Sequence, residues 1–140
     1  FRDHLALVMA VLGPDGTEVD GIGVARCIRD PDDPGLAEVA IVLVDEWQQR
    51  GTGRRLLRHL ADFALARGIS RWKGWIHDGN VVAERLFARF GREYRRARPG
   101  HGLNEVFFHL RPAGPEEIGT FPQAGLENAV DFPKNPETHL

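Results

Sequence analysis

Asp45-Glu46-Trp47-Gln48-Gln49-Arg50-Gly51-Thr52-Gly53-Arg54 separates two stretches with different hydrophobic periods. Before it, Leu36 to Val44 reads Leu-Ala-Glu-Val-Ala-Ile-Val-Leu-Val, which is rich in β-branched residues and short enough for a buried strand. After it, from Gly51 to Arg67, apolar residues recur at steps of three and four, as in an amphipathic helix, and Gly68 is a suitable C-cap. This strand, glycine turn and helix predict an α/β fold.

The residues that follow this unit predict a second crossover. Arg71 to His77 alternates as a short strand, and the helix before it makes it parallel to the first strand. Asp78-Gly79-Asn80 offers capping side chains to a helix from Val81 to Phe90, which Gly91 closes. A last strand is expected from Asn104 to Leu110.

The residues that precede the unit predict an antiparallel hairpin. Leu5 to Leu12 is an apolar run that ends in the turn Gly13-Pro14-Asp15-Gly16, and Val19 to Arg29 would be the returning strand. The loop Asp30 to Gly35 leads into the next strand. Together these elements predict a mixed, strongly twisted sheet.

Composition fits one globular domain, expected over residues 1–111 of the 140. Residues 112–140 are rich in proline, glycine and acids without periodicity, so an extended or disordered tail is expected. Hydrophobic residues make up 42% of the chain, yet no run resembles a membrane span or a signal peptide, and a cytoplasmic location is the default. The net charge of −2 provides no basic field for nucleic acid. The single cysteine, Cys27, lies in an apolar stretch and is expected to be structural.

The glycine turn has the chemistry of a phosphate site. Free main-chain N–H groups at a helix N-terminus bind pyrophosphate, and glycines let the backbone approach it. A P-loop would need Lys-Ser or Lys-Thr after the second glycine, where Arg54-Arg55 stands, and a dinucleotide fingerprint would need a third glycine, where Leu56 stands. An ordinary strand–helix turn is the alternative.

Two motifs resemble those of the GNAT family of N-acetyltransferases. Gln48, Gly51 and Gly53 match the pattern of Gln or Arg, two residues, Gly, one residue, Gly or Ala. The second signature of the family consists of Asn, Ala, Leu with an aromatic residue, and an apolar residue followed by Gly. It is resembled by the stretch Asn80-Val-Val-Ala83-Glu-Arg-Leu86-Phe87-Ala-Arg-Phe90-Gly91. The resemblance is closest to bacterial protein lysine acetyltransferase (Pat-like) domains. It implies a GNAT-like fold with helices on both faces of the sheet and a central parallel pair splayed to admit acetyl-CoA.

The resemblance also implies how acetyl-CoA would bind as acyl donor. The pantetheine arm would add to the exposed strand edge, and Asn80, unless it is a plain helix cap, would hold the pantetheine amide. No metal is expected. The implied cofactor-binding residues are Ile41, Val42 and Leu43 along the strand, and Gln48, Gln49, Arg50, Gly51, Thr52, Gly53 and Arg54 in the turn.

Glu38 is the candidate catalytic base. It is the only charge in its apolar strand, where desolvation should raise the pKa of the carboxyl, and alternation places it on one face with Ala40, Val42 and Val44. A strand-end glutamate with its head in solvent is the alternative. The resemblance implies that a main-chain N–H near Leu43 polarises the thioester carbonyl.

The leaving-group acid is left open. Many members of the family carry a tyrosine in the second helix where this chain has Phe87, which cannot donate a proton. The thiolate could leave unprotonated, or water, His77 or Tyr94 could supply the proton instead. The sequence alone does not decide among these proton sources.

The acceptor is also left open, because the family's N-terminal strand and helices, which build much of the acceptor pocket, are not found before the hairpin. A protein lysine is one candidate acceptor, and a small amine, amino acid or aminoglycoside is another. The third hypothesis is an acyl-CoA-binding module without turnover. The strand edges left exposed predict pairing with another chain, such as a second copy in a homodimer.

Overall fold

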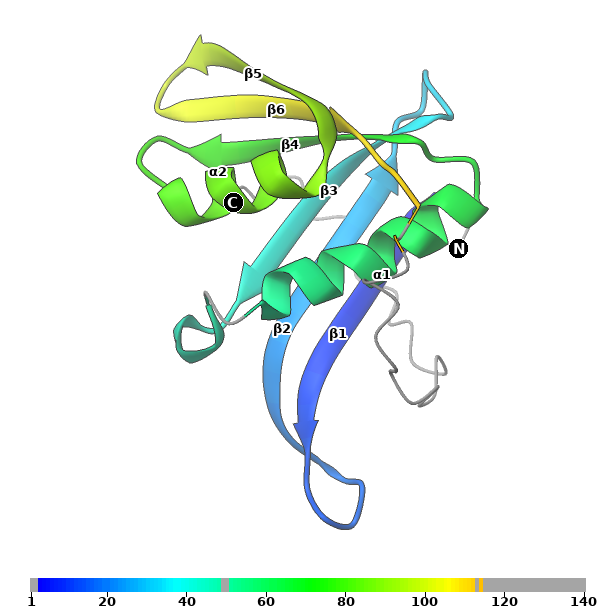
Figure 1. Cartoon of the computed structure of the whole chain (residues 1–140), viewed down its shortest axis with the longest axis vertical. Coiled ribbons are helices and arrows are strands. Elements are labelled where there is room, and N and C mark those ends of the chain that lie inside the picture. Colours follow the sequence, from blue (N-terminus) through cyan, green and yellow to red (C-terminus); the bar gives the residue numbers. More distant parts are fainter. Residues whose placement is uncertain (1–2, 49–50, 113, 115–140) are drawn as a thin grey trace.

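The computed structural model describes residues 3–48, 51–112 and 114, which form a six-stranded mixed sheet and two α-helices (Figure 1). The strand order is β1-β2-β3-β4-β6-β5. β3 and β4 are parallel, and the other neighbours are antiparallel. The strands are β1 (His4–Leu12), β2 (Glu18–Arg29), β3 (Leu36–Leu43), β4 (Arg71–His77), β5 (Arg92–Gly100) and β6 (Leu103–His109); the helices are α1 (Thr52–Ala66), α2 (Val81–Phe90) and the short 3-10 helix η1 (Asp45–Trp47).

The mixed sheet and the order of its elements agree with the sequence prediction, except for β5. No strand was predicted for Arg92–Gly100, the stretch that forms β5. β5 lies at the edge of the sheet, where it pairs only with β6 among the described residues. Edge strands tolerate charge and proline, so this one lacks the apolar alternation that reveals a strand.

Both helices lie on one face of the sheet, which corrects the expectation of helices on both faces (Figure 1). α1 contacts β1, β2 and β3, and α2 contacts β5 and α1. Their buried residues join one hydrophobic core with Val39, Trp72 and Phe108 of the sheet. Cys27 belongs to this core, and burial raises the pKa of its thiol to about 12, in line with the structural role expected for it. The opposite sheet face, here called the open face, is covered by no helix of the described residues.

Within the described ranges, no helix has the length and apolar character needed to cross a membrane.

Gly91 gives a direct test of the packing between α2 and β6. A Cβ added at Gly91 would fall inside the Phe108 side chain, while the backbone φ of −94° suits any residue. We therefore expect Gly91→Ala to lower the free energy of unfolding by about 1–3 kcal/mol through overpacking. Gly21→Ala is the matched control, since a Cβ at Gly21 meets nothing within 4 Å. Equal urea midpoints for the two variants would contradict this packing.

Candidate functional site

β3 and β4 diverge after only three residue pairs. Leu36, Ala37 and Glu38 pair with Arg71, Trp72 and Lys73. Beyond these pairs β3 continues to Leu43 and β4 to His77, and the two strands no longer pair with each other. Figure 1 shows the two strands separating toward their C-terminal ends. We call the segments that do not pair with each other, Val39–Leu43 and Gly74–His77, the β3–β4 fork.

The main chain of β3 presents polar groups to this fork. The Val44 N–H donates to the Ile22 carbonyl at 2.9 Å, so even-numbered residues of β3 direct their main-chain groups toward β2. The groups of Ile41 and Leu43 therefore face the fork. Those of Val42 face β2, and its side chain is 60% exposed on the open face. Two of the three predicted strand residues thus offer the main-chain groups that an added strand needs.

The N-terminus of α1 follows the end of β3 and begins without a side-chain cap. Gly51 is the N-cap residue at φ 78°, and the first helical hydrogen bond runs from the Arg55 N–H to the Gly51 carbonyl at 3.1 Å. The N–H groups of Thr52, Gly53 and Arg54 precede this bond, and they lack the i−4 carbonyl of an interior helical turn. This arrangement favours an anion at the helix end.

Gly53 allows α1 to pack closely against its neighbours. A Cβ at this buried position would lie 3.0 Å from Leu43 Cδ1 and 3.2 Å from Leu86 Cδ2. A bulky residue here would therefore push into the core before it filled the phosphate turn. Gln49 and Arg50, also predicted to bind the cofactor, lie outside the described residues.

Gln48 and Asn80 both have structural partners. Gln48 Nε2 donates to the Leu43 carbonyl at 3.3 Å and to Asp45 Oδ1 at 3.1 Å, which closes the turn after β3. Asn80 Oδ1 accepts the Ala83 N–H at 3.1 Å and caps α2. Asn80 follows the end of β4, which is the second strand of the β3–β4 fork.

Glu38 occupies the inner end of the fork, in the last pair before the strands diverge. Its side chain is on the open face, with Ala40 and Val42, as alternation predicted. It is exposed, so the burial expected from the apolar run is wrong. The run is apolar because Ala37, Val39 and Ile41 face the helices.

Phe87 and the two candidate proton donors, Tyr94 and His77, lie in different parts of the fold. Phe87 is fully buried, with its ring 5.4 Å from that of Phe108. Tyr94 packs against Phe108 from β5, so β6 separates its strand from β4 of the fork. His77 is exposed at the end of β4, on the fork itself. Of the three residues, only His77 belongs to the fork, at its outer end.

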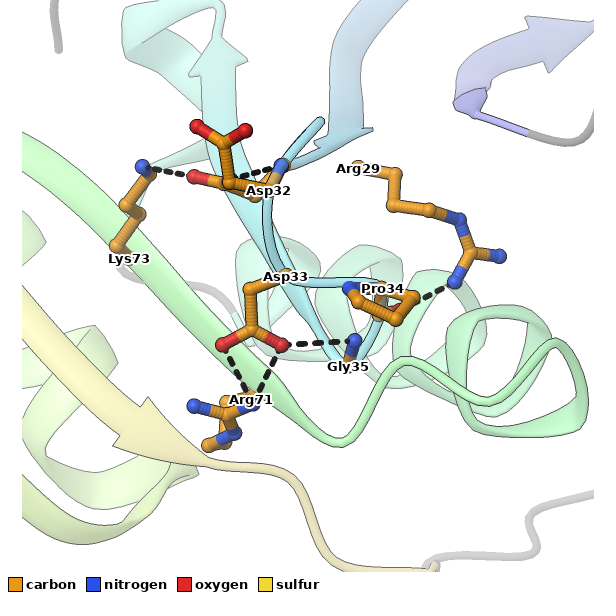
Figure 2. Close-up of polar contacts among 8 residues, drawn as sticks. Arg29, Asp32, Asp33, Pro34, Gly35, Arg71 and Lys73 are labelled. Atoms are coloured by element: carbon orange, nitrogen blue, oxygen red, sulfur yellow. Dashed lines mark hydrogen bonds and ion pairs between the residues drawn. The ribbon is translucent and has the colours of Figure 1, made fainter.

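A polar network that the sequence did not predict surrounds the inner end of the fork (Figure 2). Lys73 Nζ lies 2.7 Å from Asp30 Oδ2, and Arg71 Nη2 lies 2.8 Å from both oxygens of Asp33. The hydrogen bond with Lys73 lowers the pKa of Asp30, and the same bond raises the pKa of Lys73. The only sequence signal was the acid-rich loop Asp30 to Gly35 directly before β3.

Comparison with known proteins agrees with this geometry. A profile of the Acetyltransferase (GNAT) family matches residues 6–91. The chain is 33% identical over 129 residues to mycothiol acetyltransferase of Thermobifida fusca, covering 92% of this chain and 35% of that protein. It is 30% identical over 108 residues to acetyltransferase Pat of Mycolicibacterium smegmatis, covering 76% and 31%.

Solved structures give the same result. The GNAT domain of S. lividans PAT superposes with a TM-score of 0.64 at 26% identity, covering 78% of this chain and 62% of that one. A cAMP-binding acyltransferase from Mycobacterium smegmatis superposes with a TM-score of 0.67 at 26% identity, covering 83% and 35%.

A sheet whose central parallel strands diverge beside an uncapped helix N-terminus is the architecture of an acyl-CoA-dependent acetyltransferase domain. The chain belongs to the GNAT acetyltransferase family. It spans about a third of the length of the curated relatives it matches.

Proposed function

We propose that this chain is the catalytic domain of an acetyl-CoA-dependent N-acetyltransferase whose acceptor is a protein lysine. The observation that carries the proposal is the β3–β4 fork, with Glu38 at its inner end and the uncapped N-terminus of α1 beyond its outer end. These features lie in the order in which acetyl-CoA would need them. The thioester would sit beside Glu38, the pantetheine along Ile41 and Leu43, and the pyrophosphate at Gly51 to Arg54.

Each step of acyl transfer has a group in this arrangement. The Glu38 carboxylate accepts a proton from the incoming ammonium, directly or through water, and the free amine attacks the thioester carbonyl. The Ile41 N–H, which faces the fork closer to Glu38 than the Leu43 N–H does, polarises that carbonyl. Water returns a proton to the departing thiolate, because His77 lies at the outer end of the fork, four residues along β4 from the partner of Glu38. Asn80 contributes its Nδ2 group to the pantetheine, since its Oδ1 caps α2.

The exposure of Glu38 supports a protein lysine as acceptor. The open face around it carries no helix of the described residues, so a peptide chain could approach it without entering a closed pocket. The relatedness to mycothiol acetyltransferase favours a small-molecule amine as the second candidate. A screen of thiol release with lysine peptides and with small amines separates the two candidates.

Two further expectations belong to the same proposal. A cytoplasmic location supplies the acetyl-CoA. A homodimer would use the edge strand β1, which pairs only with β2 within the described part of the chain. Light scattering of the purified protein measures its oligomeric state.

Calorimetric titration with acetyl-CoA tests the cofactor site. We expect a Kd of about 1–100 μM, equivalent to about −8 to −5.5 kcal/mol, and no binding of ATP. Absence of acetyl-CoA binding in a folded protein would refute the proposal.

A charge placed at Gly51 tests the position of the pyrophosphate. Gly51 has a φ of 78° and nothing within 4 Å of an added Cβ, so Asp and Asn, which tolerate this conformation better than most residues, should both fit. We expect Gly51→Asp to weaken acetyl-CoA binding about tenfold relative to Gly51→Asn, since the new carboxylate repels the phosphates. The two variants share the same backbone strain and differ in charge. Equal affinities, measured by calorimetry, would place the pyrophosphate elsewhere.

A further inference from the structure

Lysine is scarce in this chain, and one of its lysines lies at the proposed site. The sequence has sixteen arginines but only two lysines, Lys73 and Lys134. Lys73 belongs to β4 and, by alternation with buried Trp72 and Gly74, its side chain is on the open face. An enzyme that acylates amines thus carries a primary amine within reach of its own site.

Lys73 is the direct neighbour of Glu38 across the parallel pair. Neighbouring strands lie about 4.8 Å apart, so the lysine side chain can extend over the inner end of the fork. Its ammonium is instead turned to the β2–β3 loop, where the Asp30 carboxylate holds it at 2.7 Å. The lysine side chain is 24% exposed and that of Asp30 is 16% exposed.

We propose that Lys73 is a self-acylation site and that its ion pair with Asp30 holds it unreactive. This inference rests on the proposed function, because it requires acetyl-CoA in the fork. A lysine is acylated only as the neutral amine, and the Asp30 carboxylate both stabilises the ammonium and directs it away from the fork. The raised pKa of Lys73, caused first by this hydrogen bond, agrees with such a restraint.

The reaction balances without any further reagent. After release from Asp30, the Lys73 ammonium gives one proton to the Glu38 carboxylate, which passes it to solvent. The Nζ lone pair forms a bond to the acetyl carbon, and the carbon–sulfur bond breaks. CoA leaves as the thiolate, the second Nζ proton is lost to solvent, and an amide remains.

Other charges near Lys73 leave Asp30 as its main restraint. Arg71 on β4 is already paired with Asp33, and His109 on β6 lies 3.3 Å from Glu93. The carboxylates of Glu38 and Glu105 act on Lys73 only through longer-range attraction. Arg26 on β2 shares the same face, two strands away from β4.

Asp30→Asn is the informative variant. Asp30 Oδ1 accepts the Asp32 N–H at 2.9 Å, and an asparagine oxygen can keep this loop contact while the charge opposite Lys73 is lost. Asp33→Asn is the matched control, because it changes the same loop but removes the partner of Arg71 instead. Each protein is incubated with acetyl-CoA, and acetylation is mapped by peptide mass spectrometry, with melting temperature as the folding check.

We expect Lys73 of Asp30→Asn to be acetylated at least about tenfold faster than Lys73 of the unmodified chain or of Asp33→Asn, since each unit of pKa lowering gives ten times more neutral amine. Excess free CoA should suppress this labelling. Equal labelling of Lys73 in all three proteins would overturn the inference, and so would labelling that CoA does not suppress. An unlabelled Asp30→Asn that still binds acetyl-CoA would overturn this inference alone, whereas loss of acetyl-CoA binding in the unmodified chain would overturn the proposed function with it.

Discussion

Glu38→Gln lowers kcat by about 100-fold or more and leaves the Kd for acetyl-CoA within about twofold, if Glu38 is the general base. The amide has nearly the same size as the carboxylate but cannot accept the ammonium proton at neutral pH. Cofactor affinity should be spared because the fork-facing groups are main-chain groups of Ile41 and Leu43. The measurement is thiol release with the best acceptor from the screen, alongside calorimetry with acetyl-CoA.

Glu105→Gln is the control for this variant. Glu105 lies on β6 and pairs with Trp75, so it is on the same open face but one strand beyond the fork. Its loss changes the charge of this face by the same amount without touching the proposed base. Similar rate losses in the two variants would reduce the role of Glu38 to general electrostatics, and an unchanged rate in Glu38→Gln across pH would remove it as the base.

Most elements of the fold were readable from the sequence because their hydrophobic periods are clear. The bounds of β4 and α2 agree with the predicted ranges, since Trp72 and Ile76 alternate and Phe87 and Phe90 are spaced by three. The side on which α2 packs was not readable. The apolar stripe of a helix shows which of its own faces is buried but not which face of the sheet it covers.

The candidate site was readable only in part. The glycine turn at Gly51 follows a local pattern, whereas the roles of Ile41 and Leu43 come from the family resemblance and stay predictions. The exposure of Glu38 was misjudged because a run of apolar residues indicates burial of both strand faces, and here one face has no helix within the described chain. The Asp30–Lys73 pair joins residues 43 positions apart, and no local pattern reports such a contact.

The largest expected loss of stability comes from Phe108→Ala. Phe108 of β6 is 1% exposed, and its ring lies 5.4–6.5 Å from four other aromatic rings, those of Trp72, Phe87, Phe90 and Tyr94. Truncation removes these contacts and leaves a cavity, so we expect a loss of about 3–5 kcal/mol in the free energy of unfolding. A domain of this size has about 5–15 kcal/mol in total, so the loss should be visible as a large shift of the urea midpoint.

Phe107→Ala provides the comparison for Phe108→Ala, because the adjacent residue has the same side chain on the open face and is only half-buried. We expect it to lose about 1 kcal/mol, in proportion to the smaller apolar area that it covers. Equal losses in the two variants would mean that the helices do not pack on the face assigned to them. A large loss only in Phe108→Ala would also bear on the fork, because Trp72, which packs against Phe108, belongs to the last pairs that hold β4 to β3. The Phe108→Ala variant should then bind acetyl-CoA more weakly even under conditions in which it remains folded.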